Sequence, residues 1–137
     1  MIACLVIVSV GVTIRKPIQW ARNLQAEDIQ KIEVVITVPQ DGNVYRVLEQ
    51  REFKDIVQRI HTSAGRYVIR PEIPGGGGFD YYITMKTGEE HVFGSNGMHV
   101  TIDGHFYMGD EELLIDWWES IIVDQPLPKD FYEKKGL

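Results

Sequence analysis

The histidines are the side chains of this sequence best suited to hold a metal ion, because neutral imidazole is a common ligand of transition metals. Three of them, His91, His99 and His105, lie among alternating apolar residues that predict strands joined by tight turns. His99 then points to the opposite face of the sheet from His105, and His91 lies on the order of 12 Å from His105, two strands away. One ion needs its donors within roughly 2–2.5 Å. We therefore predict no metal site.

The sequence also shows no arrangement of residues suited to nucleophilic or acid–base catalysis. The sequence lacks the Gly-x-Ser-x-Gly pattern of a nucleophile elbow, and its single cysteine, Cys4, lies in an apolar segment. The acidic pairs Glu89-Glu90 and Glu111-Glu112 are adjacent in sequence, so their side chains diverge on a strand or a helix. We predict no catalytic residue and no cofactor, and hence a protein that is not an enzyme. A hydrolase whose site the sequence does not reveal is the remaining alternative.

Four consecutive glycines, Gly75–Gly78, form the most unusual local sequence. A phosphate-binding loop would place Gly-Lys-Ser/Thr before a helix, whereas here an aromatic stretch typical of a strand follows. The simplest interpretation is a connector between two elements. The alternative is a loop that moves over a ligand.

Acidic residues gather in the last quarter of the chain. Residues 1–102 hold 11 acids and 11 bases, whereas residues 103–137 hold nine acids and three bases, which accounts for the net charge of −6. A chain of this charge lacks the basic surface that sequence-independent nucleic-acid binding needs, so we predict no nucleic-acid partner. An acidic helix face is ordinarily a solvated surface, and its functional alternative is a docking surface for a basic protein. The candidate interaction residues are Asp110, Glu111, Glu112, Asp116 and Glu119.

The elements that must position these residues fit one small domain. A chain of 137 residues with 44% hydrophobic side chains can bury a core, and one cysteine excludes an internal disulfide. Apolar residues at helical spacing predict helices over residues 49–63 and 110–123. Shorter stretches of alternating or β-branched residues predict strands. The predicted strands are residues 31–38, 44–48, 66–70, 79–86, 90–93, 98–102 and 105–108.

Turns between these strands set their pairing. Asp103-Gly104 is typical of a two-residue hairpin turn with both residues at positive φ. Residues 94–97 are interpreted as the preceding turn, which places Phe93 opposite Met98. No helix joins successive strands in a regular series, which favours antiparallel pairing. We predict an α+β fold, with a mostly antiparallel sheet of five to seven strands and two amphipathic helices on one face, preceded by an apolar N-terminal helix.

The aromatic residues of the second half have two possible uses. They can form the core between the sheet and the closing helix, or a stacking platform for a sugar or a peptide. On the closing helix, Leu113-Leu114 and Ile121-Ile122 widen the apolar face around Trp117 and Trp118. We therefore expect at least one of these two tryptophans to pack on the sheet against Tyr or Phe side chains.

The N-terminal segment, residues 1–14, contains no charged residue. As a helix it would span roughly 21 Å, short of the ~30 Å hydrocarbon core, and the following Arg15 and Lys16 could snorkel to the interface. We favour a membrane anchor over a signal peptide, a lipidation site at Cys4 or a buried strand. Arg15, Lys16 and Arg22 follow this segment, and the positive-inside rule would then place the rest of the chain in the cytoplasm.

The predicted organisation is an apolar anchor over residues 1–14, a helical juxtamembrane linker over residues 15–30, an α+β domain over residues 31–123 and a C-terminal tail over residues 124–137. Several stretches follow one order: Ile-x-Val-x-Ile (32–36), the helix over 49–60, Tyr-Tyr-Ile-Thr-Met-Lys-Thr-Gly-Glu (81–89), Val-Thr-Ile-Asp-Gly-x-Phe-Tyr (100–107) and a Trp-rich closing helix. This pattern resembles the small, uncharacterised membrane-anchored or lipoprotein-type domains of Gram-positive anaerobes.

The resemblance implies a domain on the outer side of the cytoplasmic membrane and carries no active site. We therefore expect a single-pass, membrane-tethered, extracytoplasmic interaction or sensing domain of the cell membrane, with a possible protein partner. The alternative is a soluble acidic protein that binds a basic protein, as immunity and inhibitor proteins do. The sequence predicts no particular oligomeric state.

Overall fold

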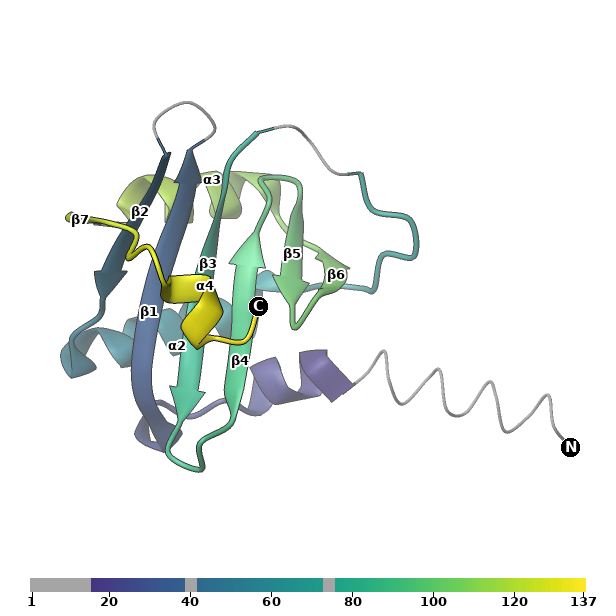
Figure 1. Ribbon diagram of the computed structural model, residues 1–137. Coiled ribbons are helices and arrows are strands. Elements are labelled where there is room, and N and C mark those ends of the chain that lie inside the picture. Colours follow the sequence, from purple (N-terminus) through teal and green to yellow (C-terminus); the bar gives the residue numbers. More distant parts are fainter. Residues whose placement is uncertain (1–15, 39–41, 73–75) are drawn as a thin grey trace, which may run out of the picture.

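The computed structural model describes residues 16–38, 42–72 and 76–137. Within them the chain forms an antiparallel sheet of seven strands in the order β6-β5-β4-β3-β1-β2-β7, with helices packed on it (Figure 1). The predicted α+β class and antiparallel sheet are therefore confirmed. Residues 1–14, interpreted as an apolar helical anchor, lie outside the described residues, as do Gly75 and the residues Pro39, Gln40 and Asp41 between the first two predicted strands.

The strands are β1 (Ile29–Val38), β2 (Gly42–Val47), β3 (Gly78–Met85), β4 (Glu90–Ser95), β5 (His99–Ile102), β6 (His105–Met108) and β7 (Gln125–Pro126). The α-helices are residues 16–23, α2 (Phe53–Ser63), α3 (Glu111–Ser120) and α4 (Phe131–Lys134). Two short 3-10 turns, η1 (Ala26–Asp28) and η2 (Gln50–Glu52), precede β1 and α2.

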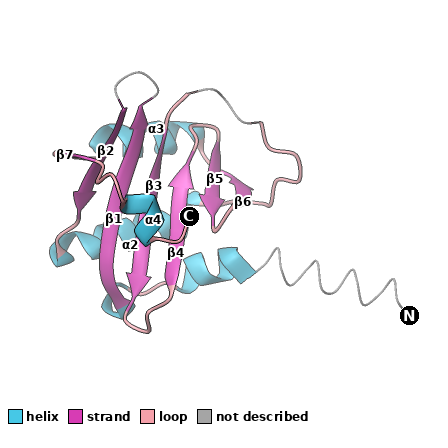
Figure 2. Cartoon of the chain, viewed as in Figure 1, coloured by secondary structure: helices cyan, strands magenta, loops and turns pink. Residues whose placement is uncertain are grey.

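The main core lies between one face of the sheet and the helices α2, α3 and 16–23, which lie on the same side of the sheet in Figure 2. Side chains alternate along a strand, so Ile32, Val34 and Ile36 of β1 reach this face together. The helices contribute the apolar stripes that their sequences predict. These side chains include Phe53, Ile56, Val57 and Ile60 of α2 and Leu114 and Trp117 of α3.

The opposite face of the sheet is covered by the C-terminal segment, which we call the strap (residues 125–137). Its strand β7 pairs with β2, and α4 then crosses in front of the sheet (Figure 1). Phe131 packs against Val35, Tyr45 and Tyr82 in a second, smaller core. Beside it, the ammonium group of Lys135 binds the carboxylates of Glu33 (2.7 Å) and Glu90.

Both segments that flank the predicted domain therefore belong to the fold. Residues 15–30 were expected to be a juxtamembrane linker, yet Ile18, Ala21 and Leu24 are buried in the main core. Residues 124–137 were expected to be a tail, yet they carry β7 and the buried Phe131. The first segment buries residues at helical spacing but only over about two turns, and the second buries Phe131 alone, so neither shows a long apolar stripe in the sequence.

Two local predictions differ from the structure. Residues 66–70 form no strand: Tyr67 makes one isolated bridge with Tyr107, and Ile69 is 83% exposed. The β4–β5 turn lies two residues later than predicted, so Phe93 pairs with Ile102 rather than Met98. Asn96 fixes the position of this turn. Its side-chain oxygen accepts hydrogen bonds from the backbone amides of Met98 and His99, the two residues that end the turn.

The predicted hairpin turn between β5 and β6 is confirmed, because Asp103 (φ 49°) and Gly104 (φ 81°) both have positive φ. The glycine-rich stretch has a packing role at its described end. A Cβ atom on Gly77 would collide with the carbonyl oxygen of Thr37, and one on Gly78 with that of Ser95. These two glycines therefore allow the chain to enter β3 between its neighbours.

Candidate functional site

The acidic residues of α3 occupy two sides of the helix. The side chain of Asp110 accepts a hydrogen bond from the backbone amide of Leu113 (3.1 Å), so Asp110 caps the helix. Asp110, Glu111 and Glu112 line one shallow depression with Ile115, whereas Asp116 lines a separate depression with Arg59 and Leu113. The five candidate residues therefore do not converge on one point.

Three of them nevertheless share an outward stripe. Glu112, Asp116 and Glu119 follow the spacing i, i+4, i+7 and all are exposed, opposite the buried Trp117. Leu113 and Ile115, about half exposed, flank this stripe. We call these five residues the α3 outer face. Exposed apolar side chains beside carboxylates suit a protein surface that is both basic and apolar.

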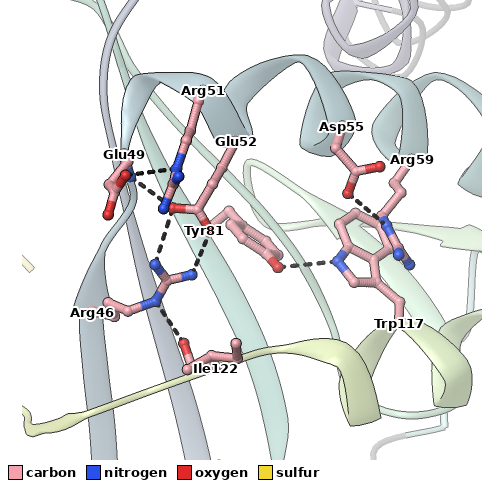
Figure 3. Close-up of polar contacts among 9 residues, drawn as sticks. All are labelled: Arg46, Glu49, Arg51, Glu52, Asp55, Arg59, Tyr81, Trp117 and Ile122. Atoms are coloured by element: carbon pink, nitrogen blue, oxygen red, sulfur yellow. Dashed lines mark hydrogen bonds and ion pairs between the residues drawn. The ribbon is translucent and has the colours of Figure 1, made fainter.

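A cavity of about 410 Å³ lies on the other side of α3, between its C-terminal end and α2, and we call it the α2–α3 cavity (Figure 3). Sequence reasoning missed this site. Its volume is in the range of small-molecule sites, roughly 300–1,000 Å³. Its polar lining is Arg46, Arg51, Glu52, Asp55, Arg59, Tyr81 and Ser120, and its apolar lining is Leu48, Ile56, Trp117, Ile121 and Ile122.

Arg46 of β2 fixes one wall of the cavity. Its two terminal nitrogens donate to both carboxylate oxygens of Glu52 (3.0 and 2.7 Å), and its Nε donates to the carbonyl oxygen of Ile122 (2.7 Å). Glu52 also accepts a hydrogen bond from the amide of Glu49 in a capping box. The hydrogen bonds from Arg46, which outweigh burial, hold the pKa of Glu52 below its usual value. This bidentate pair joins β2, η2 and the segment after α3.

Arg59 of α2 lies at the opposite end. Its Nε donates to Asp55 one helical turn earlier (3.2 Å), and its guanidinium carbon lies 5.9 Å from the ring centre of Trp117. A guanidinium over an indole face is attracted by the negative face of the ring. Arg59 is therefore held above the aromatic floor of the cavity, with a third of its side chain exposed.

Tyr81 and Trp117 form the floor. The Trp117 Nε1–H donates to the Tyr81 hydroxyl oxygen (3.0 Å), and the two rings stack with centres 5.5 Å apart (Figure 3). Burial raises the pKa of Tyr81, so the hydroxyl keeps its proton. Because its oxygen already accepts from Trp117, the hydroxyl can still donate that proton to an acceptor in the cavity.

The sequence carried part of the signal for this site. At least one of Trp117 and Trp118 was expected on the sheet, and this is confirmed by Trp117, which packs against Phe79, Tyr81 and Phe93. Arg59 lies on α2, outside its apolar stripe, and Arg46 belongs to β2. A helical pattern cannot show that two arginines from different elements meet across an aromatic floor.

His91 belongs to a different cluster of side chains. His91 Nδ1 lies 2.7 Å from a carboxylate oxygen of Asp103, and its ring stacks on Trp20 with centres 4.0 Å apart. This stack holds helix 16–23 on β4. Within residues 16–38, 42–72 and 76–137, no group of three His, Cys, Asp or Glu side chains could hold a metal ion.

No family model, curated protein or solved structure matches this sequence or its fold. Among the described residues, no helix is both long enough and apolar enough to cross a membrane.

Proposed function

We propose that this chain is a non-enzymatic, membrane-tethered interaction or sensing domain that faces the extracytoplasmic side. In this proposal, residues 1–14 insert in the membrane as an apolar helix. The observation that carries it is the position of helix 16–23, which follows the uncharged segment in sequence and is tied into the main core by Ile18, Ala21 and Leu24. A segment fixed in the membrane would therefore hold the whole domain close to the membrane surface.

The α3 outer face is the proposed protein-binding surface. Glu112, Asp116 and Glu119 provide negative charge, and Leu113 and Ile115 provide exposed apolar area. A partner with basic residues around an apolar centre complements both features. The resemblance to membrane-anchored domains of Gram-positive anaerobes supports the same function and the same side of the membrane.

Fractionation of the full-length chain tests the anchor. We expect the protein in the membrane fraction after alkaline carbonate washing, because an apolar helix remains in lipid when peripheral proteins are released. The variant Val6→Asp/Val10→Asp should move to the soluble fraction, since charges in the hydrocarbon core are costly. Val6→Leu/Val10→Leu is the matched control and should remain in the membrane.

Thiol labelling tests the side of the membrane. The sequence has one cysteine, so Cys4→Ser provides a cysteine-free chain in which Glu133→Cys on α4 is a single label site. A membrane-impermeant maleimide should label it on intact cells. Labelling only after lysis would place the domain inside, as Arg15, Lys16 and Arg22 favour.

The second candidate is a soluble binder of a basic protein, favoured by the acidic α3 outer face alone. It predicts that the full-length chain stays in the supernatant, and that Glu112→Gln/Asp116→Asn/Glu119→Gln weakens partner binding. Since surface charges are screened by salt, the partner should also dissociate as ionic strength rises.

A further inference from the structure

The α2–α3 cavity holds more hydrogen-bond donors than its own acceptors use. A guanidinium has five N–H groups. Arg46 uses three of them, to Glu52 and Ile122, and Arg59 uses one, to Asp55. With the Tyr81 hydroxyl proton, several donors remain without an acceptor in the described part of the chain. Both carboxylates of the lining are already bonded to these arginines.

The shape of the free donors indicates the ligand class. Arg51 is exposed and paired with Glu49 (2.7 Å), and Arg46 is paired with Glu52, so Arg59 is the arginine of the lining with most N–H groups free. A carboxylate has two oxygens in one plane, which match the planar fork of a guanidinium.

The remaining lining is apolar. Ile56, Ile121 and the Trp117 ring border the cavity between the two arginines. A small ligand that binds here must therefore bury an apolar body as well as its charged group. A bare inorganic ion would leave this surface wet and would gain nothing from it.

We propose that the α2–α3 cavity binds a small organic carboxylate. Its carboxylate accepts hydrogen bonds from Arg59 and from the Tyr81 hydroxyl, and its apolar body packs against Ile56 and Ile121 over the Trp117 ring. The Arg46–Glu52 pair acts as a positioning pair that keeps the far wall in place. This inference does not rest on the membrane anchor, because described residues alone form the cavity.

The experiment follows the NMR resonance of the Trp117 indole N–H proton in the full-length chain. If fractionation places the chain in membranes, the sample is prepared in a non-ionic detergent. Trp117→Phe assigns this resonance. The probes are phenylacetate and hexanoate, each compared with its uncharged amide. We expect each acid to shift the resonance to saturation, and each amide to bind at least about tenfold more weakly, because a charge-assisted hydrogen bond is lost.

Two variants locate the carboxylate. Arg59→Gln should weaken phenylacetate binding by about tenfold or more, and Tyr81→Phe by a smaller factor, since it removes one neutral donor. Arg70→Gln, an exposed arginine outside the cavity, is the matched control and should bind as the natural chain does. Melting temperatures identify any variant that does not fold, and Arg59→Lys, which keeps the charge, then replaces Arg59→Gln.

Three results would overturn the proposal. The first is that neither acid shifts the Trp117 resonance at concentrations up to about 10 mM, because binding weaker than this is negligible. The second is that each acid and its amide shift the resonance equally. The third is that inorganic phosphate displaces phenylacetate as well as a second acid does. A negative result here leaves the fractionation and labelling results unchanged, so failure of this site and failure of the proposed function are separable.

Discussion

At the scale of single residues, Trp117 joins the main core to the α2–α3 cavity. Its side chain is 3% exposed and contacts three aromatic rings of the sheet. We expect Trp117→Ala to lower the free energy of unfolding by about 3–5 kcal/mol, because it removes a large buried side chain and leaves a cavity. Trp118→Ala, at the partly buried neighbour, should cost less than half as much. Urea denaturation of both variants gives the comparison, and equal losses would contradict it.

Asp80 is the second residue with a specific consequence. It lies opposite Gly94, where a Cβ atom would collide with the Asp80 carboxylate, and burial raises the pKa of Asp80 to about 6. A pKa raised in the folded state means that the folded protein binds the proton more tightly than the unfolded chain does. The contribution of Asp80 is therefore fully present below its ordinary pKa of 3.8 and is lost as pH rises through about 6.

We therefore predict that Asp80→Asn stabilises the protein at pH 7.5, by about 1–3 kcal/mol, since one pKa unit corresponds to 1.36 kcal/mol. At pH 3.5 the two proteins should be equally stable with respect to this site. Denaturation curves at both pH values measure the difference. Asp130→Asn, at an exposed carboxylate of the strap, is the matched control, and a gain of the same sign and size there would show that the effect is not caused by burial.

At the scale of elements, the strap is held by a partly buried charge network. Glu33 accepts hydrogen bonds from Lys135 (2.7 Å) and from the Tyr45 hydroxyl (2.6 Å), and it pairs with Lys31 (3.0 Å). Burial alone would raise the pKa of Glu33, but these partners lower it. The stability from this carboxylate is therefore present above its ordinary pKa of 4.5 and is lost as pH falls below it.

Lys135→Met should destabilise the protein by about 2–3 kcal/mol at pH 7, because it leaves Glu33 buried with less compensation. Lys31→Met is the matched control: Lys31 is 45% exposed against 10% for Lys135, so its loss should cost less than about 1 kcal/mol. Adding Glu33→Gln to Lys135→Met should recover part of the loss. Strictly additive costs in this double-mutant cycle would mean that the two charges do not interact.

The same elements show what a sequence pattern can predict. Residue types close together in sequence were sufficient to predict the Asp103-Gly104 turn and α2, whose apolar residues recur at helical spacing. They failed where one side chain decides a register, as Asn96 does. They also failed for the strap and for the α2–α3 cavity, because Phe131, Arg46 and Arg59 acquire their roles from contacts between elements distant in sequence.

At the scale of the whole molecule, the two terminal segments lie on opposite faces of one sheet. Leu24, which directly follows helix 16–23, is buried in the main core, and the strap buries Phe131 in the second core. Strand β1 takes part in both, through Val34 on one face and Val35 on the other. A central strand that two cores share couples the stability of both faces, so the described domain should unfold as one cooperative unit.

We predict that Leu24→Ala and Phe131→Ala each lower one shared unfolding transition, by about 2–5 kcal/mol, and that neither creates a second transition. Far-ultraviolet circular dichroism and tryptophan fluorescence should give coincident curves for the natural chain and for both variants. Amide exchange adds a sharper criterion. In Phe131→Ala, amides of β1 and β3 should lose as much protection as those of α4, because cooperative unfolding exposes all of them together. Protection lost in α4 alone would instead identify the strap as a unit that opens independently of the sheet.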